Sequence, residues 1–538
     1  MSRLVRLLKV ALVSAAAVVV VATVPRTPVH ADTTPKVMLA YDSENVSGGQ
    51  TGDLYAVERL LTTAGVRIQT VNIANYRRGM LSRGHYDGVV TLINWPQLRL
   101  TNQSFMRDRD QFTGVRVHLG PNVTANEAQA AGVTLRTVYR QQFILHDAQS
   151  NTQQLLPFSA DQQVITSTTA DSTTLGTLTR QNGTTQYPFT AVHGQTAVMP
   201  YFTTSGMNIM LAEEMFAAVW GRHTTSAPLL TITGVTPYTN MRVLRQLATY
   251  LQNRGINFAV SVAGVYTNTD LPELDRYART LRAVELAGGV VLLHNLAVGD
   301  PGNSSASRQA LRNHTQAMVT ALANRGVLPV GMSVEAYWNQ DAVLRTDGLG
   351  QPQTVVLMGN EQTVVNVDHD GRGRTFANAY YALPGRKLTS TKMGSALAKS
   401  SLQFALPTAI TFGLPDSGRG LSDLERTISR FNGSWQSPDA SWRTQFTVGS
   451  TTIAYNHGQW QLNGQAQSIT AGQSASAGAT TPAKPREAWY NRYFQLQSTV
   501  MWVFFGVTLT IMLVFIAVGR SIYRRMYRRK GDEPHHHS

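Results

Sequence analysis

A histidine and two carboxylates stand where this chain could do chemistry. His294 ends an apolar run, Asp300 comes six residues later, and Glu335 follows the next apolar run along the chain. Imidazole and carboxylate groups at neighbouring strand ends can hold a divalent ion or exchange protons with a substrate. A lone imidazole does not hold a catalytic metal, and a histidine here can also be a buried structural residue or a sugar contact. His294, Asp300 and Glu335 are therefore candidate catalytic residues, while the sequence predicts no definite metal ligand and no cofactor.

Other kinds of catalytic or metal site are less well supported by the sequence. The chain has no cysteine, which excludes disulfides, thiolate metal sites and thiol catalysis. A glycosidase needs two carboxylates about 5–10 Å apart, for which Asp270 could join Asp300 or Glu335. Residues 368–371 read Asp-His-Asp-Gly, but acidic residues before a glycine are more typical of a hairpin or loop than of a metal site.

Aromatic and amide side chains that could contact a sugar follow the same apolar runs. Aromatic rings stack on pyranose faces, while amide side chains bind hydroxyl groups. The candidates for a glycan-binding site are Tyr238, Tyr266, Asn295, Tyr337, Trp338 and Asn339. Each of them could equally be an ordinary loop residue.

Alternating strands and helices must position these residues. Residues 226–440 contain apolar runs that predict strands, separated by helical patterns such as Met241–Asn253 and Ser307–Asn324. This order predicts an incomplete, TIM-like (β/α) barrel, whose chemistry belongs at the carboxyl ends of its strands. The predicted strands are Leu229–Thr233, Phe258–Val262, Val290–His294, Val327–Met332, Thr354–Met358 and Ala409–Phe412.

A second α/β region comes before the barrel. Residues 36–150 alternate short apolar runs with helical patterns, which predicts a flavodoxin-like or Rossmann-like domain with a parallel sheet. Its strand ends carry Asp42-Ser43-Glu44 and Asn94-Trp95, the expected places for a ligand, although no glycine-rich phosphate motif follows the first strand. Residues 151–225 are expected to form a β-rich insert and a connecting helix, and residues 441–467 a small β-hairpin region.

The two ends of the chain predict a protein of the cell membrane. Residues 1–31 have the basic start, apolar centre and small final residue of a secretory signal peptide. Residues 468–497 are expected to be a flexible linker, and residues 498–519, with the apolar run Val500–Val518, a single transmembrane helix. The arginine-rich residues 520–538 predict a cytoplasmic tail, with the rest of the chain outside the cell. Much of the net charge of +15 lies at these ends, so nucleic-acid binding is not expected.

Several segments resemble one family of secreted proteins. Residues 232–239 (ITGVTPYT), 254–260 (RGINFAV), 288–294 (GGVVLLH) and 409–415 (AITFGLP) resemble, in order and spacing, the polysaccharide-deacetylase-like proteins. This divergent branch of the carbohydrate deacetylases has an incomplete (β/α) barrel and is largely of unknown function. The resemblance covers about residues 226–435, and residues 36–120 resemble the domain that precedes the barrel in members from exopolysaccharide operons.

The chain departs from that family at its metal site. Active members close the first barrel strand with an acidic residue and place two histidines four residues apart. The corresponding positions here are Thr233-Gly234, and His294 followed by Val298. The later glutamate, histidine and final-strand histidine of the family fall near Ser333, Ala336 and Gly413-Leu414-Pro415.

The resemblance therefore implies a deacetylase-like pseudoenzyme. It would be a membrane-anchored, extracellular accessory protein of exopolysaccharide biosynthesis or export in a Gram-positive bacterium. Its expected partners are the extracellular polysaccharide, the membrane polysaccharide synthase and the membrane itself through Val500–Val518. The alternative is an active metal-dependent polysaccharide deacetylase, using a metal such as zinc, or another carbohydrate hydrolase with relocated site residues.

Overall fold

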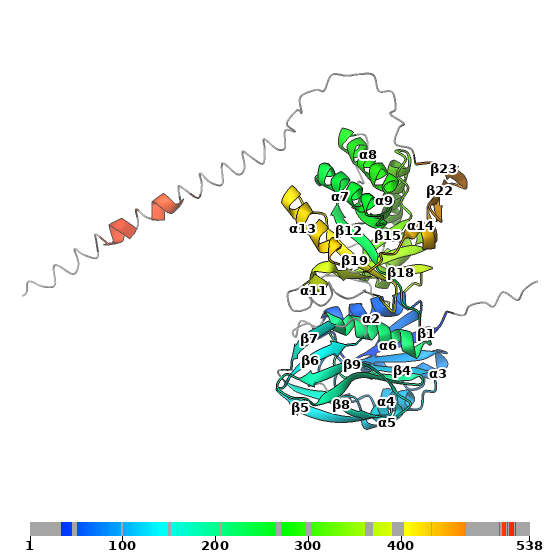
Figure 1. Cartoon of the computed structure of the whole chain (residues 1–538), viewed down its shortest axis with the longest axis vertical. Coiled ribbons are helices and arrows are strands. Elements are labelled where there is room, and N and C mark those ends of the chain that lie inside the picture. The colour runs from blue at the N-terminus through cyan, green and yellow to red at the C-terminus, as the bar shows by residue number, and fades with distance from the viewer. Residues whose placement is uncertain are drawn as a thin grey trace, which may run out of the picture. The chain divides into compact units, whose positions relative to one another are not determined.

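The computed structural model describes one compact unit that ends at Ala471 and helical parts of a second unit that begins at Gly472 (Figure 1). The predicted signal peptide and most of the predicted linker and tail lie outside the described residues. The predicted span Val500–Val518 is described only in part, and no helix within the described residues has the length and apolarity that a membrane crossing requires. The described residues are 34–45, 51–97, 100–148, 152–158, 160–204, 206–264, 271–295, 304–360, 370–389, 403–431, 433–469, 505, 508–512, 514, 516–520 and 522.

A nine-stranded sheet forms the amino-terminal half of the first unit. It begins as the predicted parallel sheet, in the order β2-β1-β3-β4, and continues through β11, β10, β9, β6 and β7. Residues after 150 therefore extend the first sheet and do not form a separate insert. The strands are β1 (Lys36–Tyr41), β2 (Arg67–Asn72), β3 (Gly88–Leu92), β4 (Val115–Leu119), β6 (Gln142–Asp147), β7 (Thr152–Pro157), β9 (Thr173–Arg180), β10 (Gln186–His193) and β11 (Thr196–Met199).

Helices cover both faces of this sheet. On one face, α3 and α4 pack on Met38 and Ala40 of β1. On the other face, α2 and α6 pack on Val37 and Leu39, because side chains alternate between the two sides of a strand. The elements are α2 (Thr51–Thr63), the 3-10 helix η2 (Ile73–Asn75), α3 (Met80–Arg83), α4 (Gln103–Asp110), α5 (Ala125–Ala130) and α6 (Met207–Val219), with β5 (Val133–Tyr139) and β8 (Asp161–Thr168) as a separate pair of strands.

Seven parallel strands form a barrel that is closed, since β12 pairs with β19 as well as with β13. The expected incomplete barrel therefore has one strand fewer than the eight of a TIM barrel, but its ring of strands is closed. The sequence also missed β18, and β15 begins at Gly331 because Val327–Val330 forms a buried loop before it. The strands are β12 (Leu229–Val235), β13 (Phe258–Ala263), β14 (Gly289–His294), β15 (Gly331–Glu335), β17 (Thr354–Met358), β18 (Asn378–Pro384) and β19 (Thr408–Gly413).

The barrel has helices of its own around only part of its wall. Long helices follow β12, β13, β14 and β19, whereas α10, η3 and α11 after β15 and β18 are short. The helices are α7 (Met241–Asn253), α8 (Pro272–Leu286), α9 (Ser305–Ala323), α10 (Tyr337–Gln340), the π-helical turn η3 (Leu344–Gly348), α11 (Gly385–Thr389) and α13 (Gly418–Ser429).

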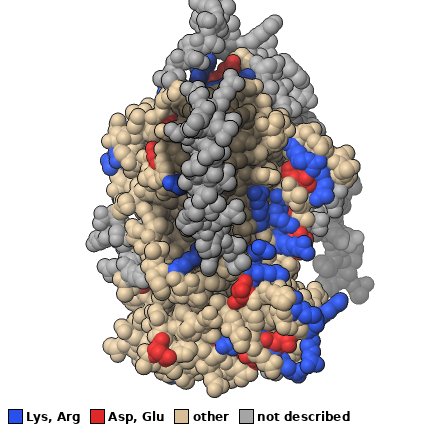
Figure 2. All heavy atoms as spheres, turned by 90° about the vertical axis from the view of Figure 1, so that its right-hand side faces the viewer, with Lys and Arg blue, Asp and Glu red and all other residues tan. Residues whose placement is uncertain are grey.

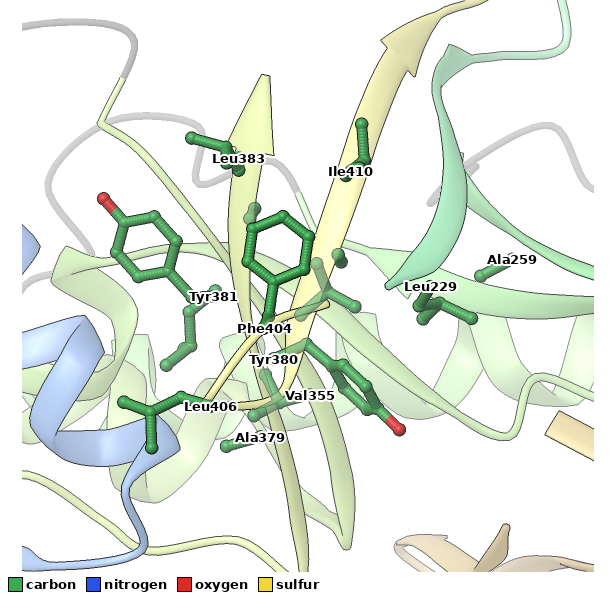
Figure 3. Packing of buried hydrophobic residues seen from close by; sticks show 14 of the residues in the cluster. Leu229, Ala259, Val355, Ala379, Tyr380, Tyr381, Leu383, Phe404, Leu406 and Ile410 are labelled. Carbon is green, nitrogen blue, oxygen red and sulfur yellow. The ribbon is translucent and has the colours of Figure 1, made fainter. Parts of the chain in front are cut away.

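Helices α2 and α6 of the amino-terminal half cover the remaining wall (Figure 1). Arg59 of α2 is buried and donates to the carbonyl oxygens of Leu357 (3.2 Å) and Ala382 (3.3 Å) and to the Tyr381 hydroxyl (3.0 Å). In Figure 3, the Tyr381 ring lies on the side of β18 where the blue ribbon is drawn. Glu213 of α6 accepts a bond from Thr408 at the start of β19. One continuous apolar core therefore joins the sheet to the barrel.

A five-stranded antiparallel sheet covers the end of the barrel at which strands β15 and β17 begin. The Thr354 hydroxyl, at the start of β17, donates to the Thr444 hydroxyl (2.7 Å), which donates to Val330 O just before β15 (3.3 Å). The predicted hairpin region is thus a meander, and it leaves the carboxyl ends of the barrel strands uncovered by its own strands. Its elements are β16 (Gln351–Pro352), α14 (Pro438–Ser441), β20 (Arg443–Val448), β21 (Thr451–Asn456), β22 (Gln459–Leu462) and β23 (Gln465–Gln467).

Candidate functional site

His294 and Glu335 meet at the barrel mouth, the ring formed by the carboxyl ends of its strands. They are the last residues of the neighbouring strands β14 and β15. His294 Nδ1 lies 2.7 Å from Ser333 O, and His294 Nε2 lies 3.8 Å from Glu335 Oε1. Because a carbonyl only accepts, Nδ1 carries a proton, and Nε2 is directed at the carboxylate. The fold therefore brings together two of the three candidate catalytic residues.

The pair is held from inside the barrel and keeps free hydrogen-bonding capacity. Ser333 is fully buried, and its hydroxyl donates to the Ser261 hydroxyl of β13 at 2.7 Å. Glu335 Oε2 is buried and has no hydrogen-bond partner within the described part of the chain. An unpaired buried oxygen is costly, so this carboxylate is a ready acceptor for a ligand hydroxyl. The pair can bind hydroxyl groups, and the imidazole can also exchange a proton.

Another arc of the mouth carries almost no side chains. Gly234 and Gly413 lie on the adjacent strands β12 and β19, and a Cβ added to either glycine would meet no atom within 4 Å. Gly234 also has a φ of +75°, which favours glycine. Beyond it, Tyr238 is 89% exposed. An open backbone surface beside an exposed aromatic ring suits the flat face of a pyranose.

The other predicted glycan contacts are distributed differently. Tyr337 is half-buried in α10, and burial together with the charge of Glu335 raises its pKa to about 12. Trp338 is fully buried, and Asn295 and Asn339 are only 1% and 3% exposed, so these three residues present no surface to a ligand. Trp338 and Asn339 belong to the core because α10 folds back onto the barrel, where the Trp338 ring packs tightly against Gly348. Asn295 follows β14, and its side-chain amide donates to the Thr315 hydroxyl of α9 at 2.8 Å. Tyr266, Asp270, Asp300, Asp368 and His369 lie outside the described residues.

The described residues contain no group of three or more His, Cys, Asp or Glu side chains placed to hold a metal ion. His294 and Glu335 offer two ligands of suitable type at the mouth. Asp370 and Gly371 of the Asp-His-Asp-Gly segment are described, and the Asp370 carboxylate forms an ion pair with Arg345 at 2.5 Å.

The strand ends of the amino-terminal sheet also meet, as the sequence predicts. The Asp42 carboxylate, just after β1, accepts backbone N–H groups from Ser43 (2.7 Å), Asn94 (2.8 Å) and Trp95 (3.0 Å). Burial raises the pKa of Asp42, and these three bonds oppose that rise. The carboxylate thus ties β1 to the end of β3, and Trp95, 45% exposed, is the more accessible residue of this site.

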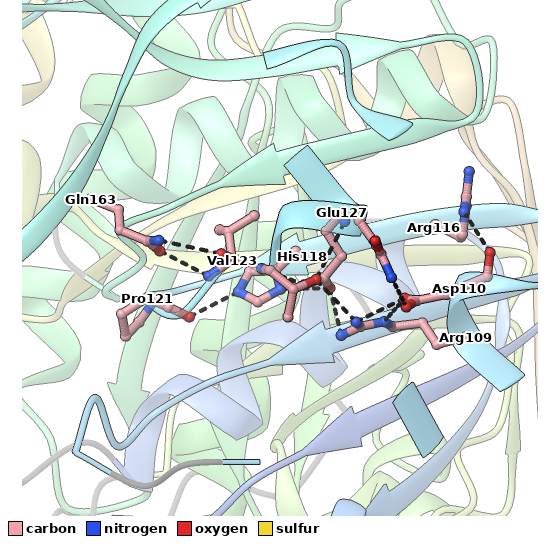
Figure 4. Close-up of polar contacts among 10 residues, drawn as sticks. Arg109, Asp110, Arg116, His118, Pro121, Val123, Glu127 and Gln163 are labelled. Carbon is pink, nitrogen blue, oxygen red and sulfur yellow. Dashed lines mark hydrogen bonds and ion pairs between the residues drawn. The ribbon is translucent and has the colours of Figure 1, made fainter. Parts of the chain in front are cut away.

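Sequence reasoning missed a buried polar cluster beside β4 (Figure 4). Glu127 lies 2.8 Å from His118 Nδ1 and 2.7 Å from Arg109 Nη1, while His118 Nε2 lies 2.9 Å from Pro121 O. Burial alone would raise the pKa of Glu127, but its contacts with His118, Arg109 and the Thr124 amide lower it to about 2. The sequence does contain a signal for part of this cluster, because Thr124 and Glu127 have the spacing of a capping box and form one at the start of α5. We interpret this cluster as a structural link between α4, β4 and α5.

Comparisons with known proteins identify no family. No protein-family model and no curated protein matches the chain. A solved ThuA-like protein from Parabacteroides merdae aligns with 36% of this chain and 93% of its own length, at 12% identity and a TM-score of 0.22. The cobalamin-dependent S-adenosylmethionine radical enzyme OxsB aligns with 74% of this chain and 61% of its own, at 10% identity and a TM-score of 0.16. Neither similarity is high enough to support an inference.

Proposed function

We propose that the barrel mouth binds a carbohydrate chain and that the protein is a non-catalytic accessory of exopolysaccharide biosynthesis or export. The observation that supports this most is the composition of the mouth. Hydroxyl acceptors at His294 and Glu335 share it with the open Gly234–Gly413 surface and the exposed ring of Tyr238. Sugar sites combine these features, with polar groups for hydroxyls and an aromatic ring for the apolar face.

The residues that replace the family's metal ligands support a binding role over catalysis. The Thr233 hydroxyl donates to Phe412 O at 3.4 Å, within the wall of the barrel. Ser333 bonds to Ser261, and Gly413 has no side chain to offer. These three positions therefore contribute shape and rigidity to the mouth, whereas in the resembling deacetylases they would carry chemistry.

Binding can be tested with the full chain in detergent on an array of neutral polysaccharides. Tyr238→Ala should weaken capture about three- to tenfold, the usual contribution of one stacked ring. Tyr139→Ala is the matched control, because Tyr139 is also well exposed but lies on β5, in the amino-terminal half. Equal affinities of wild type and Tyr238→Ala, or no captured glycan at all, would contradict the proposal.

In this role the protein lies on the outer surface of the cell membrane, anchored by residues 498–519 beside the polysaccharide synthase. Replacing Val500–Val518 by an unrelated apolar span keeps an anchor but removes any helix-specific contact. We expect polymer secretion to fall in this variant. Unchanged secretion would show that the synthase is not a partner through this segment.

A hydrolase is the second candidate, and the contact between His294 and Glu335 favours it. An active deacetylase with relocated ligands would hold zinc through these two side chains and a third ligand, for which Asp300 is the sequence candidate. Calorimetric zinc binding to the chain without its terminal histidines tests this, together with acetate release from acetylated oligosaccharides. Stoichiometric binding that His294→Ala abolishes, accompanied by acetate release, would replace the accessory role by catalysis.

A further inference from the structure

Six cationic side chains come from the starts of β1 and β2, from α3 and the residues just before it, and from a barrel segment that docks on β2, and we call them the basic row. Figure 2 looks onto the side of the molecule where Figure 1 places β1 and α3, and Lys and Arg outnumber the carboxylates there. The basic row consists of Lys36, Arg67, Arg77, Arg78, Arg83 and Arg372, of which Lys36 is half-buried and the other five are exposed.

A short segment of the barrel, residues 370–374, completes the row by docking on the edge strand β2; we call it the strap. Thr70 N donates to Gly371 O (2.6 Å), and Arg372 forms a β-bridge with Gln69. Arg345 holds the strap from the barrel side, since its Nη1 donates to Arg372 O at 2.6 Å and its Nη2 pairs with Asp370. Five members of the row therefore come from the amino-terminal half, and the strap adds Arg372.

The members of the row are neighbours in the structure. Arg67 pairs with Lys36 in register across β2 and β1. The Lys36 ammonium lies 4.4 Å from the centre of the Tyr86 ring, and the charge of Arg372 also acts on Tyr86. Arg83, at the end of α3, donates from Nη2 to Arg78 O just before the helix at 2.7 Å.

No member of the row has a carboxylate partner among the ion pairs of the described residues. Other arginines have a carboxylate partner: Arg308 and Arg312 share Asp347, for example. Carboxylates beside the row have other bonds, and Asp370 of the strap pairs with Arg345. Asp87 accepts the Lys36 backbone N–H (2.8 Å), and Asp108 accepts from the Tyr76 hydroxyl (2.7 Å). The row therefore presents unpaired positive charge to solvent, where like charges repel one another.

We infer that the basic row binds an acidic polysaccharide chain, with carboxylates or phosphates along its length. A guanidinium forms paired hydrogen bonds to both of these anions, and five of the six members are arginines. Charges spread from the strap and the starts of β1 and β2 to α3 suit an extended polymer better than a compact ligand. The inference rests on the proposed function in one respect, that the protein works among extracellular polysaccharides. It concerns a different surface from the barrel mouth.

Retention of the full chain in detergent on immobilised polygalacturonate tests the inference, with neutral dextran as the reference matrix. Replacing four row members together (Arg67→Gln, Arg77→Gln, Arg78→Gln, Arg372→Gln) should weaken binding about tenfold, since exposed charge contacts contribute modestly each. The matched control removes the same charge from exposed positions on α7 and α8 (Arg242→Gln, Arg245→Gln, Arg276→Gln, Arg279→Gln) and should bind as wild type does. Equal unfolding midpoints of the two variants confirm that both are folded.

Three results would overturn the inference. Equal loss in the control variant would mean that net charge alone is measured. Absence of binding to polygalacturonate at about 0.1 M salt would remove the polymer as a partner. Arginine-dependent capture by phosphatidylglycerol vesicles without capture by polygalacturonate would assign the row to a membrane surface. Tyr238→Ala should retain polygalacturonate binding, so failure at the barrel mouth and failure at the row can be told apart.

Discussion

Arg59 offers the sharpest test of how the two halves are joined. Its guanidinium leaves α2, stacks over the Tyr381 ring with 4.2 Å between the guanidinium carbon and the ring centre, and donates to two barrel carbonyls and one hydroxyl. Arg59→Met keeps an unbranched side chain of similar length but removes every donor. The carbonyls of Leu357 and Ala382 and the hydroxyl of Tyr381 would then lose their Arg59 bonds inside the core.

The expected cost follows from these three acceptors. Each buried group left without its bond costs about 1–3 kcal/mol, which sums to several kcal/mol. Part of this is offset, because burial lowers the pKa of Arg59 and so already disfavours its charge in the folded state. We expect Arg59→Met to lower the free energy of unfolding by about 3 kcal/mol. Arg59→Lys keeps a single ammonium and should fall between wild type and Arg59→Met.

Urea unfolding, followed by tryptophan fluorescence and circular dichroism, measures these differences. Arg245→Met is the control, because Arg245 is exposed on α7 and its loss should change stability by less than about 0.5 kcal/mol. A double-mutant cycle of Arg59→Met with Tyr381→Phe isolates the contact and should give a coupling of about 1 kcal/mol. A loss below about 1 kcal/mol for Arg59→Met, or strictly additive effects, would refute the idea that this side chain joins the halves.

Three further predictions concern buried groups and the strap. Burial raises the pKa of Glu285 from 4.5 to about 8, so stability should fall as pH rises through this window; Glu285→Gln, measured by urea unfolding at several pH values, should flatten the fall by up to about 1.4 kcal/mol per pH unit. The pKa of Glu127 is instead lowered to about 2, so its contribution to the free energy of unfolding is present above pH 4.5 and is lost toward pH 2. The Glu127→Gln variant should be about 3 kcal/mol less stable than wild type at pH 7. Equal stability of the two proteins would contradict the ion-paired cluster. Gly371 has a φ of +69°, and an added Cβ would lie 2.5 Å from Thr70 O; Gly371→Ala should displace the strap and speed hydrogen exchange of the Thr70 amide, whereas unchanged exchange would count against the docking.

Local periodicity was enough to predict much of the barrel. The predicted bounds of Met241–Asn253 and Thr354–Met358 are those of α7 and β17, because an amphipathic helix and a wholly apolar strand each carry a strong signal in their own residues. Strand β18 was missed because Asn378, two alanines and Pro384, all of which are depleted in strands, weaken its pattern. The tyrosine side chains of β18 are held by residues far away in the sequence. Tyr381 contacts Arg59 of α2, and the Tyr380 hydroxyl accepts a hydrogen bond from Trp442 at 2.7 Å.

The candidate site was predictable in its strand ends and less so in its side chains. His294 and Glu335 meet because the carboxyl ends of parallel strands share one rim, which the order of strands already implies. Trp338 follows the same rim in sequence, yet it is fully buried, and α10, a helix of four residues, is what turns it inward. Whether an aromatic residue after a strand faces solvent depends on packing that is absent from its local sequence.

The shared wall between α2, α6 and the barrel has a consequence for the order of synthesis. The ribosome completes α6 by Val219, long before β17 begins at Thr354. Most residues of α6 are buried in the finished protein, some of them by the barrel strands that are made last. The apolar surface of α6 therefore stays exposed to solvent until the barrel strands have been synthesised. During that time the nascent chain can aggregate through this surface or bind a chaperone. Fragments that stop near residue 225 would keep that exposed state permanently, so the two halves are better expressed as one piece than as separate modules.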